Sequence, residues 1–397
     1  MTDTEAQDVR GTQTHGVHME RTSRRPPTVS FVVPCYKLAH LLGECVDSIL
    51  AQTFGDLEVL IMDDCSPDDT AEVARAYTDP RVIHVRNDPN LGHLRNYNKG
   101  IELARGKYVW LISADDYLRR PYVVERYVKV MEANPRIAYA FCAGVGVRDG
   151  VETPALDYSL VEDRDRVIPG RSWLKRQLRL NLVLAASGLV RRDLYEKCGA
   201  FPLDMPWAGD WYLWCLLALY GDVAFFAEPM VCYREHPLSM TNTLTQGQAE
   251  ACAADEIAIP WRIKAKADAA GYAQVSRDCL RAVTEIYERN TAWDRFGMST
   301  PILNLEKFEE SLRRYCGSER ERDEIRARVF AALGSRHDVR GEALEAGRLY
   351  KAALEKDPWM LKVQVKRALL ALGPAGAVVR KLARAARGAD GRSRSGA

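Results

Sequence analysis

From Val29 onward, short apolar runs alternate with longer stretches in which apolar residues recur every three or four positions. The short runs have the length and β-branched content of buried strands, and the longer ones have the spacing of amphipathic helices. This alternation predicts βαβ units and an α/β fold with a mostly parallel sheet flanked by helices. Asp68 and Asp69 are expected to cap the second helix, and Pro121 to lie in the first turn of the fourth. The expected strands are residues 29–34, 57–62, 81–86, 107–112 and 137–147, and the expected helices are residues 40–53, 68–78, 92–106 and 121–135.

Beyond about residue 150 the alternation fades, and the pattern predicts an aromatic-rich helix opened by Asp210, followed by a strand and a polar loop. From Gln246 onward the chain has the pattern of successive helices, with Pro260, Pro301 and Gly317 as breaks. Residues 340–372 resemble one helical pair of tetratricopeptide type, and a single copy is too little to indicate a repeat array.

These patterns divide the chain into four expected parts. Residues 1–27 are polar and are expected to form a flexible tail, without the apolar core of a signal peptide. Residues 28–245 are expected to form the α/β domain, and residues 246–385 a helical region. Residues 386–397 form a basic tail that is expected to be disordered, an interpretation favoured over contact with anionic lipid.

Composition narrows the class of protein. A hydrophobic content of 47% and a charged content of 28% are typical of a soluble globular protein. The net charge of +2 gives no reason to expect nucleic acid as a partner, and no apolar run has the length that a membrane span needs, which leaves at most peripheral membrane contact. The ten cysteines form no CxxC pair or regular framework, which favours free thiols in a reducing cytoplasm.

Acidic pairs follow two of the expected strands. Asp63 and Asp64 come after the second strand, and Asp115 and Asp116 after the fourth. Ligands of open α/β sheets bind outside the carboxyl ends of the strands, so these pairs mark a candidate site. Asp115 and Asp116 could be a turn with a helix cap, a carboxylate pair with separated pKa values, or ligands for a divalent cation. Asp63 and Asp64 could likewise belong to a helix-capping turn.

Further candidates are distributed along the chain. Arg95, which begins a helix, could contact phosphate or remain a surface arginine. Asp210 could be a helix N-cap, a general base, or both. Trp207 and Trp211 flank it and could either pack in the core or form a platform for a sugar ring.

The ordered series of motifs resembles the family 2 glycosyltransferases of the GT-A fold, over roughly residues 29–241. The opening strand "VSFVVPCYK" matches first, and "LGECVDSILAQTFGDLEVLIMDDCSPDDT" follows with its acidic turn. The stretch "NLGHLRNYNKGIELARGKYVWLISADD" then leads to an acidic motif of the DxD type, here with the variant Ala-Asp-Asp. The resemblance implies that residues 28–148 bind the nucleotide and residues 149–245 the acceptor.

The resemblance also implies roles for individual residues. Asp64 would hold a uracil or thymine base, with Pro34, Tyr36 and Arg95 also in the nucleotide site. Asp115 would contact the ribose or metal side of the nucleotide, and Asp116 would coordinate Mn²⁺ or Mg²⁺ at the diphosphate. Asp210 would be the general base of an inverting transfer. The loop "CYREHPLSMT" adds Arg234 as a phosphate contact and His236 as a metal or diphosphate contact.

Three alternatives remain at this point. A nucleotidyltransferase of the same fold would need a glycine-rich phosphate loop after the first strand, and no glycine precedes Gly43 there. A non-catalytic nucleotide- or carbohydrate-binding protein would not need Asp64, Asp115, Asp116 and Asp210 together. Transfer to a polyprenyl phosphate would ordinarily bring a membrane anchor.

The donor and the acceptor also remain open. Uracil and thymine present the same N3–H, so a UDP-sugar and a dTDP-sugar are both compatible. The acceptor could be a saccharide, a glycolipid or a small natural product, and the C-terminal helices are a candidate homodimer interface.

Overall fold

The structure, a computed structural model, describes residues 25–155, 161–237, 239–245, 248–290 and 304–379. Most of the predicted N-terminal tail, Pro301 and the predicted basic tail lie outside these residues. Among the described helices, none combines the length and apolar character needed to span a membrane.

A ten-stranded sheet forms the centre of the described chain, in the order β3-β2-β1-β4-β9-β6-β10-β5, with β7 beside β6 and β8 beside β10. Strands β3, β2, β1 and β4 pair in parallel, as do β6 and β10. Strand β9 pairs antiparallel with both β4 and β6 and joins the two parallel parts. The strands are β1 Val29–Cys35, β2 Leu57–Asp63, β3 Val82–Arg86, β4 Tyr108–Leu111, β5 Tyr117–Leu118, β6 Ile137–Arg148, β7 Val151–Ala155, β8 Arg166–Ile168, β9 Leu189–Arg191 and β10 Asp222–Arg234.

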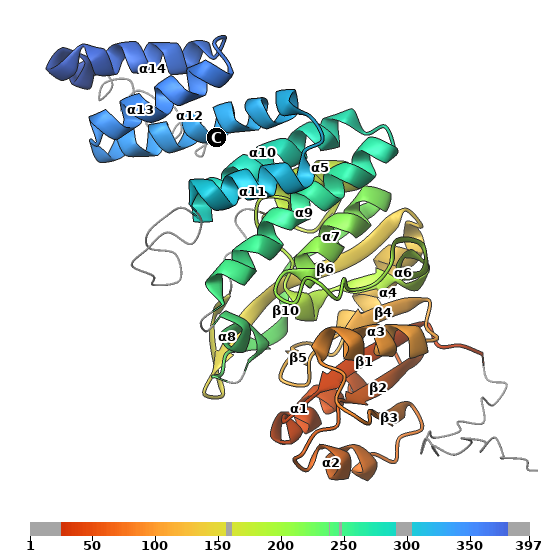
Figure 1. The fold of residues 1–397 in the computed structure, drawn as a ribbon. Helices are drawn as coiled ribbons and strands as arrows, with labels where there is room; N and C mark the ends of the chain where they lie inside the picture. Colours follow the sequence, from red (N-terminus) through yellow and green to blue (C-terminus); the bar gives the residue numbers. More distant parts are fainter. Residues whose placement is uncertain (1–24, 156–160, 238, 246–247, 291–303, 380–397) are drawn as a thin grey trace, which may run out of the picture.

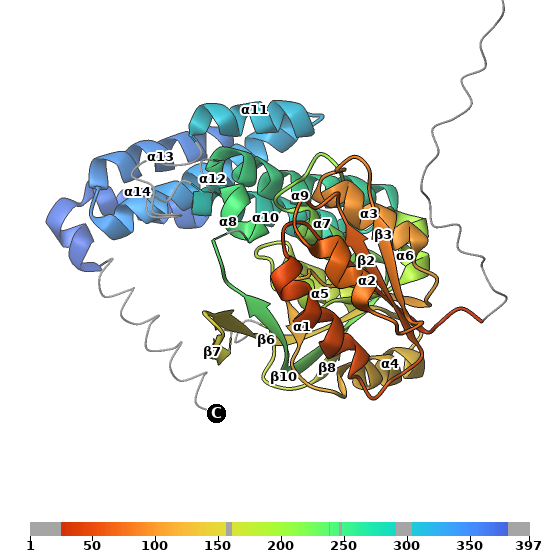
Figure 2. The ribbon, with the colours of Figure 1, turned by 90° about the horizontal axis from the view of Figure 1, so that it is seen from below.

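Helices cover both faces of this sheet (Figures 1 and 2). Helices α1, α2 and α4 pack on one face around an apolar cluster that includes Val46, Ile61 and Tyr127. Helices α3, α5, α6 and α7 contribute to a larger cluster on the other face. The helices named so far are α1 Ala39–Leu50, α2 Thr70–Ala76, α3 His93–Leu103, α4 Val123–Ala133, α5 Gly170–Gln177, α6 Arg192–Cys198 and α7 Gly209–Tyr220.

The C-terminal helices share the larger apolar cluster with the α/β part. Ile259 of α9 and Ile286 of α10 belong to the same cluster as Leu213 of α7. Helices α12, α13 and α14 continue outward from the sheet (Figure 1), and α12 still contributes Val329 to this cluster. These elements are α8 Met240–Thr245, α9 Ala249–Ala269, α10 Ala273–Asn290, α11 Leu305–Tyr315, α12 Glu319–Arg340, α13 Ala343–Lys356 and α14 Leu361–Ala371.

The α/β class and the five expected strands are confirmed, and several local predictions are wrong. Asp69 stands at the N-cap of α2 as expected but makes no side-chain cap bond, whereas Asp68 accepts the backbone N–H of Thr70 at 3.3 Å. Pro121 precedes α4 by two residues, because the helix begins at Val123 with Tyr122 as its N-cap. Pro260 lies inside α9, where buried neighbours such as Ile259 hold the helix on the core despite the missing N–H donor.

Gly100 sets how closely α3 approaches the sheet. A Cβ at this position would lie 2.3 Å from Cγ1 of Val32 and 3.1 Å from Cγ of Met62. Only a residue without a side chain allows this separation between α3 and strands β1 and β2. The start of the same helix carries residues that line the site described below.

Gly100→Ala is therefore expected to destabilise the fold by about 1–3 kcal/mol, because the added methyl group overpacks the contact between helix and sheet. Gly347→Ala in α13 is the matched control, since a Cβ there meets nothing within 4 Å. That control is expected to stabilise by about 0.5–1 kcal/mol through its higher helix propensity. Urea unfolding of both variants measures the two effects, and equal stability of the variants would contradict the close packing at Gly100.

Candidate active site

The two carboxylates that end β2 have different surroundings. Asp63 is fully buried and accepts hydrogen bonds from Arg86 Nη1 at 2.5 Å and from the backbone N–H of Ser66 at 2.8 Å, with His84 Nε2 at 3.2 Å. Burial alone would raise the pKa of Asp63, but the bonds from His84, Ser66 and Arg86 outweigh it and hold the pKa below its usual value. Asp63 is therefore a structural anchor between β2 and β3.

Asp64 holds the loop that leads into α3. Its carboxylate accepts from Asn87 Nδ2 at 2.8 Å and from the backbone N–H groups of Leu91 and Gly92 at 2.8 and 2.9 Å. Gly92 has a φ of 79°, a conformation that glycine adopts without strain. An ionised carboxylate offers about four lone-pair sites, so these three bonds leave Asp64 able to accept from a ligand.

The acids that follow β4 are buried side by side with few partners. Asp115 Oδ2 lies 2.9 Å from Nε2 of His236, and Asp116 Oδ1 accepts the backbone N–H of Arg234 at 2.9 Å. Burial, and then the neighbouring charge of Asp115, raise the pKa of Asp116 well above its usual value. Within the described part of the chain, Asp115 Oδ1 is buried without a hydrogen-bond partner. The loop after β10 therefore returns to the end of β4 and places His236 beside Asp115.

Two adjoining cavities open beside these acids. The first, here called the strand-end cavity, is lined by residues that include Pro34, Tyr36, Asp64 and Asp115. The second, here called the aromatic cavity, takes in the acids after β4 and a wall of aromatic side chains. Both cavities are lined by His93, Tyr97, Ser113, Asp115 and Met240.

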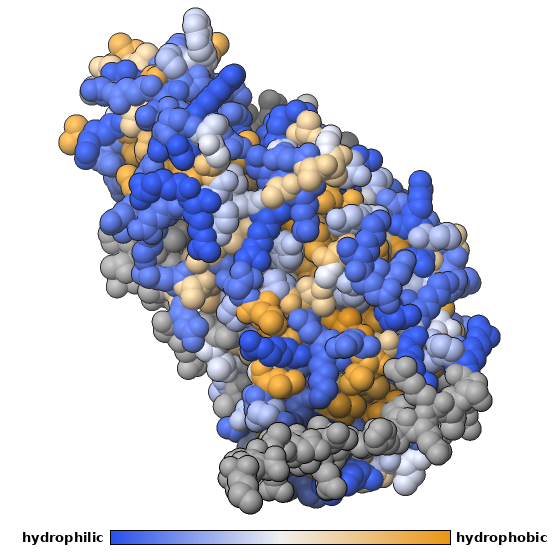
Figure 3. All heavy atoms as spheres, turned by 45° about the vertical axis from the view of Figure 1, so that its right-hand side comes forward, coloured by the Kyte–Doolittle hydropathy of each residue, from blue (hydrophilic) through white to orange (hydrophobic). Residues whose placement is uncertain are grey.

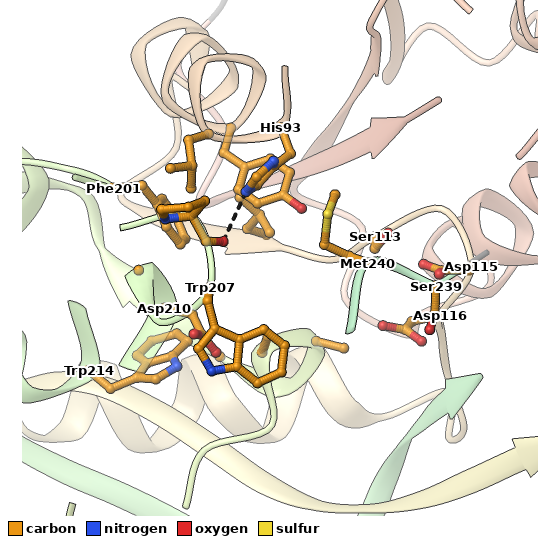
Figure 4. A pocket seen from close by; sticks show the side chains of 18 of the residues that line it. His93, Ser113, Asp115, Asp116, Phe201, Trp207, Asp210, Trp214, Ser239 and Met240 are labelled. Carbon is orange, nitrogen blue, oxygen red and sulfur yellow. Dashed lines mark hydrogen bonds between the residues drawn. The ribbon is translucent and has the colours of Figure 1, made fainter. Parts of the chain in front are cut away.

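Asp210 enters the aromatic cavity from the first turn of α7 (Figure 4). Burial raises its pKa, although hydrogen bonds from the backbone of Trp211 and from Asn181 act in the opposite direction. Asn181 Nδ2 donates to Asp210 Oδ2 at 3.0 Å, and Gln177 Nε2 in turn donates to Asn181 Oδ1 at 3.0 Å. Asp210 is not the N-cap, which is Ala208, so a local capping role does not explain its position.

The start of α7 is capped from the C-terminal helices. Asp255 of α9 accepts the backbone N–H groups of Trp207 and Ala208 through one oxygen, at 2.9 and 3.2 Å. These bonds satisfy donors at the helix end that the side chain of Ala208 cannot reach. Asp255 therefore fixes the segment that carries both Trp207 and Asp210.

The three tryptophans around Asp210 differ in role. Trp207 lines the aromatic cavity, whereas Trp211 is buried and donates its indole N–H to the carbonyl oxygen of Gln177 at 2.5 Å. Trp214, which the sequence analysis did not single out, also lines the cavity beside Asp210 (Figure 4). Its ring is 4% exposed, and its Nε1 has no hydrogen-bond partner among the described residues. The sequence could have indicated Trp214, because it lies four residues after Asp210 and therefore on the same face of the helix.

His93 and Arg95, near the start of α3, differ in their relation to the cavities. His93 lines both cavities, and its Nε2 lies 3.1 Å from the carbonyl oxygen of Pro206, which joins α3 to the segment before α7 (Figure 4). Arg95 is exposed on α3 and is not among the residues that line either cavity. The side chain of Arg234 forms an ion pair with Glu44 at 2.6 Å.

The acids after β4 are suited to a hard divalent cation. Carboxylate oxygens are the preferred ligands of Mg²⁺ and Mn²⁺, and Asp115 Oδ1 is an unpartnered buried oxygen. The described residues hold no cluster of three or more protein ligands positioned for a metal ion. Mg²⁺ is commonly held by one or two carboxylates together with the phosphates of a substrate, and Asp115 and Asp116 fit this kind of site.

Comparison with known proteins gives matches over the α/β part of the chain. Residues 30–199 match the model of Glycosyl transferase family 2. The uncharacterized glycosyltransferase EpsJ of Bacillus subtilis is 39% identical over 226 residues, which are 54% of this chain and 63% of EpsJ. An uncharacterized glycosyltransferase of Rickettsia typhi is 25% identical over 229 residues, which are 55% of this chain and 67% of that protein.

Solved structures extend the likeness to the C-terminal helices. Residues 1–349 of TarS from S. aureus, in complex with UDP-GlcNAc, superpose with a TM-score of 0.53 at 15% identity. The superposition covers 88% of each chain, so it reaches beyond the α/β part and shows a shared fold. The family match and the curated relatives agree over the α/β part: residues 30–199 are similar to the glycosyltransferases of family 2, and the solved structures share the fold of the chain.

Proposed function

We propose that this protein transfers a sugar from a nucleotide-diphosphate sugar to an acceptor hydroxyl, with inversion at the anomeric carbon and Asp210 as general base. The observation that carries the proposal is that Asp210 lines the same cavity as the acid pair Asp115 and Asp116. A base and a diphosphate-binding pair at one cavity are what such a transfer requires.

The strand-end cavity is the proposed donor site. Asp64 would accept the N3–H of a uracil or thymine base, and Pro34 and Tyr36 line the cavity beside it. The side chain of Tyr36 is 44% exposed, which leaves its ring available to stack on a base. The TarS structures of the same fold were solved in complex with UDP-GlcNAc and with UDP. These observations support a UDP- or dTDP-sugar as donor.

Asp115, Asp116 and His236 are the proposed holders of Mn²⁺ or Mg²⁺. When bound, the cation would supply positive charge that stabilises the departing diphosphate. The hydrogen bond between His236 and Asp115 fixes the orientation of one carboxylate, and the backbone of Arg234 fixes the other. Arg234, whose guanidinium is engaged with Glu44, would reach phosphate only by exchanging that partner. Arg95 remains a proposed phosphate contact that would act from the outer side of α3.

Asp210 would accept the proton of the attacking hydroxyl as the oxygen bonds to the anomeric carbon. Its raised pKa makes it a stronger base than an exposed carboxylate, and the bond from Asn181 orients its side chain at the wall of the cavity. A single base with attack opposite the leaving diphosphate gives inversion, in contrast to mechanisms that use two working carboxylates.

The aromatic cavity is the proposed acceptor site. Trp207 offers a flat apolar face and Trp214 a hydrogen-bond donor, a combination that suits the faces and hydroxyls of a sugar ring. A saccharide, the sugar of a glycolipid, or a small hydroxylated natural product would fit this chemistry.

All ten cysteines are free thiols, and most are buried, which supports a reducing cytoplasmic setting.

Asp210→Asn is expected to lower the transfer rate by about 10²–10⁴-fold while nucleotide binding is retained, because the amide keeps the shape but cannot take a proton. Release of UDP or dTDP from a panel of nucleotide sugars measures the rate. In the unmodified enzyme, kcat/KM should fall as the pH drops through an apparent pKa above the usual 3.8, since only the unprotonated carboxylate is active. Asp204→Asn, six residues earlier and paired with Arg262, is the matched control with near-normal rate. A normal rate in Asp210→Asn would remove Asp210 as the base.

Trp214→Phe is expected to lower kcat/KM for the acceptor roughly tenfold, which corresponds to the loss of one hydrogen bond of about 1.4 kcal/mol. The phenyl ring keeps the aromatic contact with Tyr139, whose ring centroid lies 5.1 Å from that of Trp214. Trp211→Phe is the control, because its N–H bonds to Gln177 within the protein and its loss should lower stability but not acceptor use. Equal acceptor kinetics in both variants would contradict the assignment of Trp214 to the acceptor.

A further inference from the structure

Helix α14 carries apolar side chains on two opposite faces. On its inner face Val363 is buried and belongs to a cluster with Ala346 and Tyr350 of α13. On the opposite face Leu361 and Val365 are 69% and 52% exposed. A helix that is apolar on two faces ordinarily has both of them covered. The inner face is covered by α13, and the outer face is uncovered in the described chain.

The outer apolar residues form one continuous stripe. Leu361, Val365, Ala368 and Leu372 stand at positions i, i+4, i+7 and i+11, which places them in one row along a helix. At 100° per residue this row points away from the direction of Val363. Leu372, the C-cap residue with φ −78° and ψ 3°, is 61% exposed and continues the row.

An aromatic residue and a basic residue accompany the stripe. Trp359, directly before the helix, is 89% exposed, and Lys362 is exposed about a quarter-turn around the helix from the stripe. Helix α14 contains no acidic residue. We call Trp359, the stripe and Lys362 together the α14 face. It combines an apolar row, a basic neighbour and an interfacial aromatic residue, as helices that lie on membranes do.

The positive charge of the chain is concentrated in its C-terminal segment. Residues 361–397 contain nine lysines and arginines and one acidic residue, whereas the whole chain has a net charge of only +2. Residues 1–360 are therefore net negative, and the positive charge gathers in the same segment as the exposed stripe. Attraction to a negative surface would orient the protein with this end toward it.

We propose that the α14 face is a docking surface for an anionic lipid membrane, on which the helix lies flat with its stripe among the acyl chains. Figures 1 and 2 place α14 at the outer end of the molecule, away from the sheet, so a flat surface can reach it. In Figure 3 this end is mostly hydrophilic on the face in view, with hydrophobic residues at its outer edge. A second copy paired through α14 is less favoured, because two helices without acidic residues would oppose like charges.

Flotation of the full chain with vesicles tests this surface without any assay of transferase activity. We expect binding to vesicles of equal parts phosphatidylcholine and phosphatidylglycerol, and little binding to phosphatidylcholine alone. The double variant Val365→Asp/Leu372→Asp should lower the bound fraction at least about tenfold, because it places charge in the acyl region. The matched control Leu180→Asp/Leu203→Asp changes exposed leucines at 42% and 52% exposure elsewhere and should bind like the unmodified chain.

Each other outcome overturns the proposal. Full binding by the Val365/Leu372 variant would mean that basic residues alone attract the vesicles, and equal binding to neutral vesicles would exclude the role of charge. A dimer in light scattering that the same variant converts to a monomer would assign the face to a second copy. Unchanged melting temperatures of both double variants, expected for exposed positions, confirm that loss of binding is not loss of folding.

Discussion

The site depends on two adjacent carboxylates that are buried with little compensating charge. Asp115 and Asp116 are 8% and 5% exposed, and the guanidinium nearest them is engaged with Glu44. Like charges withdrawn from water must either take up protons, which the raised pKa of Asp116 expresses, or gather a cation. The parallel strands place these two repelling carboxylates at the sheet edge where the donor would bind. A cation bound there would relieve the repulsion between the two carboxylates, which is the physical basis of the proposed diphosphate site.

The same edge shows how much the sequence could predict. The strand pattern located both acid pairs, because the carboxyl ends of parallel strands meet at one edge. His236 was singled out only by the family resemblance, and its contact with Asp115 comes from the structure. The strand pattern could not tell that Asp63 anchors β3 whereas Asp64 faces a cavity, since that difference arises from His84 and Arg86 on a neighbouring strand. The prediction that Pro260 breaks a helix was wrong for a similar reason, because the tertiary packing of α9 outweighs the local helix-breaking tendency of proline.

The C-terminal helices support the helix that carries Asp210. Asp255 of α9 holds the backbone of Trp207 and Ala208, and the apolar cluster continues from α7 into α9 and α10. The predicted boundary near residue 245 is thus crossed by one core. Sequence periodicity indicated these helices but gave no sign of that contact, because a carboxylate that caps a distant helix has no local pattern.

Calorimetric titration with UDP, in the presence of Mn²⁺ and in the presence of a chelator, tests the central claim most directly. If Asp115 and Asp116 form a cation-dependent diphosphate site, Mn²⁺ should strengthen UDP binding at least about tenfold, a difference of about 1.4 kcal/mol. Asp116→Asn should remove that gain, whereas Asp63→Asn should lower stability and leave the gain intact. UDP binding of equal strength with and without the metal, or an undiminished gain in Asp116→Asn, would contradict the account.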